Sequence, residues 1–251
     1  MEMRLRQIAL VASDLEAART DIVSVLGLGH AHADPAVGRY GLANAVFPVG
    51  DTFLEVVSPV VEGTTAGRLL EKRGGDGGYM VILQTERLAE ARDRVRAAGA
   101  RIVAQKDGDG VAFTHLHPRD VGGTILSIDY MNPPERWDWG GPYWREHINR
   151  DRVLSIRGAE LQGEAPDRMA ARWAEVLGCR AERSGEIWRI GLRHGELRFT
   201  GLRDRRGEGL RAIDVVASDA RAIRDAAERR SLIDAEGYVT LCGTLVHLVN
   251  P

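Results

Sequence analysis

A ten-residue stretch at residues 50–59, GDTFLEVVSP, has three relatives in the same chain, and this repetition constrains the fold more than any other feature. The relatives are GGTILSIDYMNP at 122–133, RHGELRFTG at 193–201 and CGTLVHLVNP at 242–251. Each places a turn residue before a short β-branched or aromatic run, and each follows another strand-like run. Two apolar runs around a glycine turn predict a β-hairpin. Four such hairpins predict four copies of one structural unit.

A strand and an amphipathic helix precede each hairpin. The first unit opens with a strand over residues 4–12, after which Ser13 is the expected helix N-cap, with Glu16 three residues later as in a capping box. Gly27 is the expected end of this helix. The positions that share one helical face are Leu15, Ala18, Ile22 and Val25. The first unit therefore reads as strand, helix and about three strands.

The same order recurs in the other three units. A strand over 77–85 ends at Thr85, the expected cap of the second helix, and Pro166 is the expected start of the third helix. Ser218 is the expected cap of the fourth helix. The inward-facing positions of these helices are expected to be Leu88, Ala91, Val95, Ala98, Met169, Trp173, Val176, Ile223 and Ala227. The sequence thus predicts an α+β protein of four βαβββ modules.

The four modules group into two predicted domains. Residues 1–133 hold the first two modules, 134–151 form a linker rich in Trp, Pro and Gly, and 152–251 hold a more degenerate second pair. The linker tryptophans are Trp137, Trp139 and Trp144. Two interpretations stay open for them, either pinning the linker onto both domains or covering a pocket as an aromatic lid.

Charge and hydropathy argue against a nucleic-acid-binding or membrane-spanning protein. The 251 residues carry a formal net charge of −2, which lacks the basic footprint of a nucleic-acid-binding protein. No apolar run approaches membrane-spanning length, and there is no apolar leader at the start of the sequence. Cys179 and Cys242 lack CxxC spacing and fit a reduced compartment. We therefore expect a soluble cytoplasmic protein without nucleic-acid or membrane partners, and a homodimer stays open.

Three stretches carry a resemblance to a known family. They are RQIALVASDLEAARTDIVSVLGLG, GDTFLEV and FTHLHPRDVGGTILSID. The chain resembles the vicinal-oxygen-chelate superfamily of glyoxalases, bleomycin-resistance proteins and extradiol dioxygenases, and its first half looks most like methylmalonyl-CoA epimerases. The resemblance covers nearly the whole chain. It implies modules paired into two glyoxalase-like domains, with curved mixed sheets and helices outside.

The resemblance also implies where a divalent metal would bind. In the first pair of modules the ligand positions fall on Gln7, Glu55, Met80 and Ser127, and only Glu55 is a strong ligand. In the second pair they fall on Gly158, Phe199, Ala212 and His247, and only His247 can bind a metal. Neither set reaches the three ligands of catalytic zinc or the two His and one acid of an iron dioxygenase. We therefore expect no metal, no cofactor and no extradiol cleavage.

Two histidines stand two residues apart in an expected strand. His115 and His117 would then share one face and could hold a metal, although a structural role is the favoured interpretation. Asp129 lies two residues beyond Ser127 and would place a carboxylate on the same face. These observations leave a non-standard metal site at the two histidines open.

Glu55 is the best candidate for a functional group. If it lies in an apolar cup, burial would raise its pKa and suit it to proton transfer; an alternative interpretation pairs it with an arginine at the rim. The expected ligand contacts are Gln7, Met80, Ser127, Asp129 and His117. The sequence favours a glyoxalase-like protein that binds a small organic ligand. The alternative is a lyase or isomerase acting on a carbonyl or acyl-CoA substrate, with Glu55 as the proton-transfer residue.

Overall fold

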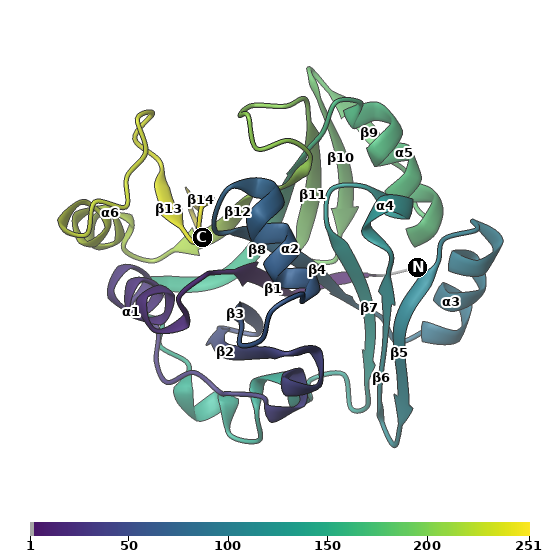
Figure 1. Cartoon of the computed structure of the whole chain (residues 1–251), viewed down its shortest axis with the longest axis horizontal. Helices are drawn as coiled ribbons and strands as arrows, with labels where there is room; N and C mark the ends of the chain where they lie inside the picture. Colours follow the sequence, from purple (N-terminus) through teal and green to yellow (C-terminus); the bar gives the residue numbers. More distant parts are fainter. Residues whose placement is uncertain (1–2) are drawn as a thin grey trace. The chain divides into compact units, whose positions relative to one another are not determined.

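Two seven-stranded mixed sheets with helices make up the structure, a computed structural model that describes residues 3–251 (Figure 1). The first sheet has the order β2-β3-β1-β4-β7-β6-β5, and the second has the order β13-β14-β12-β8-β11-β10-β9. In each sheet parallel pairs such as β1–β3 and β8–β11 lie next to antiparallel hairpins. The predicted α+β fold of four βαβββ modules is confirmed.

The element bounds follow the repeat. The first sheet contains β1 (Arg4–Val11), β2 (Leu42–Val49), β3 (Thr52–Pro59), β4 (Gly77–Gln84), β5 (Ile102–Gly108), β6 (Val111–Leu116) and β7 (Ile125–Met131). The second contains β8 (Val153–Gln162), β9 (Glu182–Ser184), β10 (Ile187–Leu192), β11 (Gly195–Thr200), β12 (Gly209–Ala217), β13 (Val239–Leu241) and β14 (Thr244–Val249). The α-helices are α1 (Leu15–Leu26), α2 (Thr65–Arg73), α3 (Leu88–Ala97), α4 (Pro118–Val121), α5 (Pro166–Leu177) and α6 (Ala220–Arg229). Short 3₁₀ turns are η1 (Pro35–Tyr40), η2 (Asp138–Gly140) and η3 (Trp144–His147).

The four predicted hairpins are all antiparallel strand pairs. They are β2–β3, β6–β7, β10–β11 and β13–β14. Gly50, in the first turn, has φ of +64° and lies where a Cβ would come within 2.1 Å of the Leu154 carbonyl oxygen. Only glycine fits such a position without a shift of the backbone. The β6–β7 pair differs from the prediction, because α4 separates its strands instead of a tight turn.

The capping prediction for α1 is wrong by one residue. Asp14 is the N-cap, and its carboxylate accepts hydrogen bonds from the backbone N–H groups of Glu16 and Ala17. Ser13 instead donates from its backbone N–H and its hydroxyl to Asp76, at 2.9 and 3.0 Å. Aspartate satisfies the first helical N–H groups as well as serine does, and its charge also favours the helix N-terminus. The predicted helix end at Gly27 is confirmed.

Two other capping predictions are also wrong. Asp219, rather than Ser218, caps α6 by accepting from the N–H of Ala222 at 2.9 Å. Thr85 accepts a bond from the Arg87 N–H but does not cap α3, which starts after Arg87 without a side-chain cap. The predicted buried faces are confirmed at most positions, with Leu15 and Ala98 only half-buried. The helix α2 follows the first hairpin and was not predicted.

By internal packing the chain divides into two compact units. Unit 1 contains the residues up to Arg6, Met80–Trp137 and Gly158–Arg211, and unit 2 contains Gln7–Tyr79, Asp138–Arg157 and Ala212–Pro251. In unit 1, α3 packs against α5, and the Trp173 ring lies 5.7 Å from the Phe199 ring. In unit 2, α1 packs against α6. The domain bounds 1–133 and 152–251 stay a prediction.

The tryptophan-rich segment contributes to both units. In unit 1 the Arg6 guanidinium lies over the Trp137 ring at 5.2 Å, and in unit 2 the Trp144 ring lies edge-on to Phe53 at 5.0 Å. Trp137 and Trp144 are buried and Trp139 is half-buried. The Trp137 and Trp144 rings are thus fixed by packing inside their own units, which agrees with a structural role. The aromatic lid stays a prediction.

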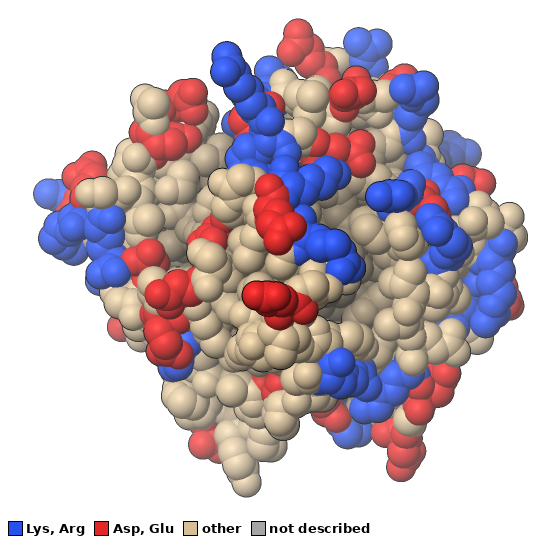
Figure 2. Space-filling view, in the orientation of Figure 1, with Lys and Arg blue, Asp and Glu red and all other residues tan. Residues whose placement is uncertain are grey.

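The surface carries both signs of charge. Figure 2 shows basic and acidic side chains interspersed over the viewed face. None of the helices in the described part of the chain is long and apolar enough to cross a membrane.

Candidate functional site

The Glu55 carboxylate lies in unit 2 and is held by two side-chain amides. On the parallel pair β1–β3, Gln7 stands beside Phe53 and two residues before the partner of Glu55, so all three side chains share one face. Gln7 Nε2 donates to Glu55 Oε2 at 2.8 Å, and Asn44 Nδ2 donates to Glu55 Oε1 at 2.6 Å. Only 6% of the Glu55 surface is exposed. Each carboxylate oxygen therefore has a fixed amide donor.

A backbone contact fixes the direction of the Asn44 amide. Asn44 Oδ1 accepts a hydrogen bond from the backbone N–H of Asp34 at 2.9 Å. Because a backbone N–H can only donate, the oxygen of this amide must face Asp34 and the nitrogen must face Glu55. The donor to the carboxylate is therefore set by the chain at the start of η1.

Burial dominates the electrostatics around Glu55. The pKa of Glu55 is raised above its ordinary value, chiefly because burial disfavours the charged form. The hydrogen bonds from Asn44 and Gln7 lower this pKa, and the negative charge of Asp34 raises it. The pKa of the Tyr79 phenol is raised to about 12, first by burial and then by the Glu55 charge. A carboxyl with a raised pKa next to fixed donors is suited to hold or exchange a proton.

A second polar cluster lies in unit 1. The Ser127 hydroxyl donates to Asp129, and both residues are buried. The strand register places Gln84 beside Asp129 and His115 beside Ser127, all on one face. Gln84 Nε2 donates to the Pro134 carbonyl oxygen at 2.7 Å, whereas its buried Oε1 has no partner among the described residues. Ser127 and Asp129 thus come together as predicted from their spacing.

The two remaining predicted ligand contacts are Met80 and His117. Met80 is buried on β4 beside Ile125 of β7. His117 does not share a strand face with His115, because β6 ends at residue 116; this expectation is wrong. Instead His117 is the N-cap of α4, and its Nδ1 accepts from the Arg119 N–H at 3.1 Å. The proline that follows starts a helical turn and so ends the strand.

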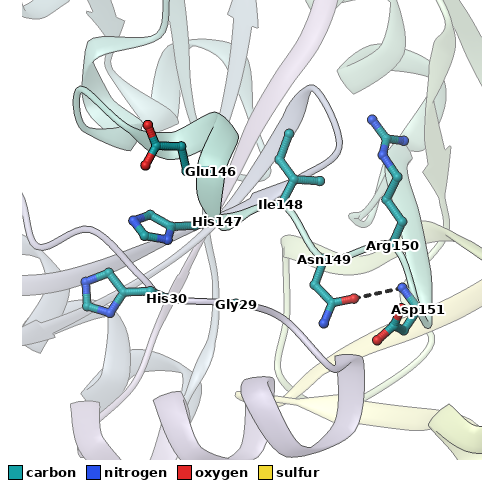
Figure 3. Close-up of a pocket in the computed structure, with 8 residues that line it drawn as sticks. All are labelled: Gly29, His30, Glu146, His147, Ile148, Asn149, Arg150 and Asp151. Carbon is teal, nitrogen blue, oxygen red and sulfur yellow. Dashed lines mark hydrogen bonds between the residues drawn. The ribbon is translucent and has the colours of Figure 1, made fainter.

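A cavity of about 520 Å³ lies elsewhere in unit 2 (Figure 3). It is lined by Gly29, His30, Glu146, His147, Ile148, Asn149, Arg150 and Asp151. The His30 and His147 rings lie edge to face with their centres 5.1 Å apart. Among residues 3–251, no three His, Cys, Asp or Glu side chains converge in a way that could hold a metal ion.

The comparisons with known proteins agree with this architecture. A family model described as a glyoxalase-like domain matches residues 8–177. The chain belongs to this glyoxalase-like family. The match begins within β1, covers the rest of the first sheet and runs to the end of α5. It includes Asn44, Glu55 and the Ser127–Asp129 pair, and Gln7 lies one residue before it. The predicted superfamily is therefore confirmed.

Individual relatives of the glyoxalase-like chain include one curated protein and two informative structures. It is 28% identical over 134 residues to an ethylmalonyl-CoA/methylmalonyl-CoA epimerase of Cereibacter sphaeroides, covering 51% of this chain and 98% of the epimerase. A mutant 4-hydroxymandelate synthase from Streptomyces coelicolor superposes with a TM-score of 0.70 at 16% identity, covering 92% of this chain and 76% of the synthase. A hypothetical protein from Staphylococcus aureus gives a TM-score of 0.66 at 11% identity, covering 99% and 100%. At these identities the two structures show the fold alone.

Sequence analysis of the glyoxalase-like chain missed Asn44, the second donor to Glu55. The signal was present, because Asn44 is a polar residue inside the apolar run LANAVFPV. Asn44 lies two positions before Val46, which is the antiparallel partner of Glu55. The Asn44 side chain therefore lies on the same face of the sheet as the Glu55 carboxylate. A rule that inspects lone polar residues in buried strands would have found it.

Proposed function

We propose that this glyoxalase-like protein binds a small organic ligand at Glu55, and that the ligand presents a hydrogen-bond donor to this carboxylate. The observation that carries the proposal is the buried Glu55 carboxylate clamped by the amides of Gln7 and Asn44. A hydroxyl, an enol or an amide N–H of the ligand would supply such a donor.

The free-energy cost of burying a carboxylate supports this assignment. Burying a carboxylate is unfavourable by several kcal/mol unless its oxygens are bonded. Each oxygen has two lone-pair directions, and one side-chain amide satisfies only one of them. Phe53 lies on the same strand face and supplies an apolar neighbour. A mostly apolar surface with a few fixed polar groups is typical of small-molecule sites.

The family's divalent metal does not fit the residues present. Both Glu55 oxygens already accept bonds from amides, and the Ser127 hydroxyl is bonded to Asp129. Met80 offers a thioether, which suits soft ions rather than the ions used by these enzymes. No step of the proposal therefore runs through a metal.

Four predicted ligand contacts belong to unit 1, and we propose each of them independently of Glu55. Ser127 and Asp129 form a buried pair that can meet a polar ligand group, and Met80 can contact an apolar one. His117 is proposed as a contact through its ring, although its Nδ1 is engaged at the start of α4. Substitution of each of these residues separately, followed by ligand titration, tests these roles.

Proton transfer at Glu55 is the second candidate function. It is favoured by the raised pKa of Glu55 and by the 28% identity to an acyl-CoA epimerase. In such a reaction the carboxylate would take the proton next to a thioester carbonyl and could return it to the same face of the enolate. Inversion would need a second acid to deliver a proton to the opposite face. The enolate would need a donor at its oxygen. Neither lyase nor isomerase chemistry follows from the fold alone.

One pair of experiments separates these functions. A thermal-shift screen of small carboxylic acids, hydroxy acids and acyl-CoA esters, repeated with Glu55→Gln, identifies ligands that need the carboxylate. NMR then follows deuterium uptake from D₂O at the α-carbon of methylmalonyl-CoA and ethylmalonyl-CoA. Binding that weakens in Glu55→Gln without deuterium uptake supports the binder, and uptake abolished by Glu55→Gln supports the isomerase. Equal ligand affinity in both proteins would contradict the binder, and deuterium uptake that persists in Glu55→Gln would contradict the isomerase.

A further inference from the structure

A row of charged side chains crosses four strands, β10, β11, β8 and the start of β12, on the face of unit 1 turned away from α5. Phe199 of β11 packs against Trp173 of α5, so the alternate residues Arg198 and Thr200 point to the other face. The register pairs Arg198 with Glu160 of β8 and with Arg189 of β10. The row therefore lies across the second sheet, which the more degenerate pair of modules forms.

The row is a continuous chain of ion pairs. Arg189 Nη1 lies 2.5 Å from Glu196 Oε1, and Arg198 Nη1 lies 3.1 Å from the same oxygen. Arg198 Nε lies 3.3 Å from Glu160 Oε2. Arg211 Nη1 lies 2.7 Å from Glu160 Oε1. The side chains of Arg198 and Glu160 are each only 10% exposed.

Structural stability alone explains such a row poorly. Removing ions from water costs several kcal/mol each, and buried ion pairs often contribute no net stability compared with apolar residues. Three guanidinium groups and two carboxylates leave a net charge of +1 among these five side chains. One further negative charge would balance the row.

Two unsatisfied polar atoms lie on the same strands. Thr200 is 2% exposed, and its hydroxyl has no hydrogen-bond partner among residues 3–251. Arg189 Nε is likewise buried without a partner. Buried polar atoms are almost always bonded, so an orphaned pair on one face indicates a missing partner. Both atoms can donate to an oxygen.

We propose that this face of β10 and β11 binds the carboxylate group of a small organic acid, through the guanidinium of Arg189 and the hydroxyl of Thr200. A guanidinium presents its N–H groups in a planar fork that matches a carboxylate. The single excess positive charge fits a carboxylate better than a doubly charged phosphate. The proposal uses none of the residues around Glu55 and does not depend on a ligand there.

The test uses the intact protein and simple probes. Benzoate, acetate and inorganic phosphate are titrated at low ionic strength, with NMR chemical shifts as readout, since simple acids are expected to bind with Kd on the order of 1 mM. Arg189→Gln should weaken carboxylate binding at least tenfold, about the 1.4 kcal/mol that one such interaction represents. Thr200→Val keeps the shape of the side chain and should weaken binding severalfold. Arg221→Gln, which removes a highly exposed cation on α6, is the matched control and should leave binding unchanged.

Three results would overturn the proposal. One is the absence of saturable carboxylate binding in the unmodified protein. Another is binding of phosphate alone, which would assign a different anion. A third is equal weakening in Arg189→Gln and Arg221→Gln, which would indicate general charge attraction rather than a site. Because Thr200→Val changes no charge, it separates a specific contact from screening even if Arg189→Gln folds poorly.

Discussion

Replacing Asn44 by alanine tests the account of the buried carboxylate most directly. The change removes the donor to Glu55 at 2.6 Å and the acceptor for the Asp34 N–H at 2.9 Å. A hydrogen bond to a charged group contributes about 1.5–3 kcal/mol and a neutral one about 0.5–1.5 kcal/mol. Water can replace the contact at half-buried Asp34, so we expect Asn44→Ala to lower the free energy of unfolding by about 2–4 kcal/mol at pH 7.

The effect of Asn44→Ala on the free energy of unfolding should depend on pH in a defined direction. The folded-state pKa of Glu55 is raised, so its contribution to stability is full below the ordinary value of 4.5 and is lost as pH rises through the folded pKa. Asn44 is one of the groups that lower this pKa. Its removal raises the pKa further, so the cost of Asn44→Ala should be largest at neutral pH and smallest near pH 4.

Equilibrium urea unfolding, followed by tryptophan fluorescence at pH 7 and pH 4, measures this cost. Asn149→Ala is a matched control, because Asn149 accepts a single neutral bond from the Asp151 N–H in a loop. It should cost about 1 kcal/mol or less, with little pH dependence. A cost for Asn44→Ala below about 1 kcal/mol at pH 7, or a larger cost at pH 4, would refute the reasoning.

Three further predictions follow from burial. Trp173→Ala should lower the unfolding free energy by about 3–5 kcal/mol, since the ring is fully buried between α5 and β11; a smaller loss in urea unfolding would mean that the ring is not a core residue. Tyr79 should stay protonated in ultraviolet titration up to about pH 12, and stability should fall above pH 10, where only the unfolded chain releases this proton; Tyr79→Phe should remove that part of the fall. Exposed Cys179 should react with a disulfide reagent in the native protein at pH 8, whereas Cys242, whose pKa is raised to about 12 by burial, should react only after unfolding.

The sequence by itself determined the repeat and the elements it contains. Alternating apolar residues around turn glycines predicted the four hairpins, and the 3.6-residue period predicted the buried faces of α1, α3, α5 and α6. It also placed Gln7 next to Glu55, through the resemblance to a known family. The hairpins and the helix faces are local features, because they depend on backbone periodicity within one segment. Choices between adjacent polar residues, such as Ser13 and Asp14, were less predictable, since both can cap a helix.

The tertiary structure decided which side chains meet. A period of two tells which face of a strand a residue occupies, but the neighbours on that face depend on the register between strands far apart in the chain. Asn44 reaches Glu55 through the β2–β3 register, and Arg198 reaches Glu160, 38 residues away, through β8–β11. His117 left its expected face because a helical turn begins there. Burial and hydrogen bonding of a polar group are set by such contacts, and so are the charge and reactivity of the sites they form.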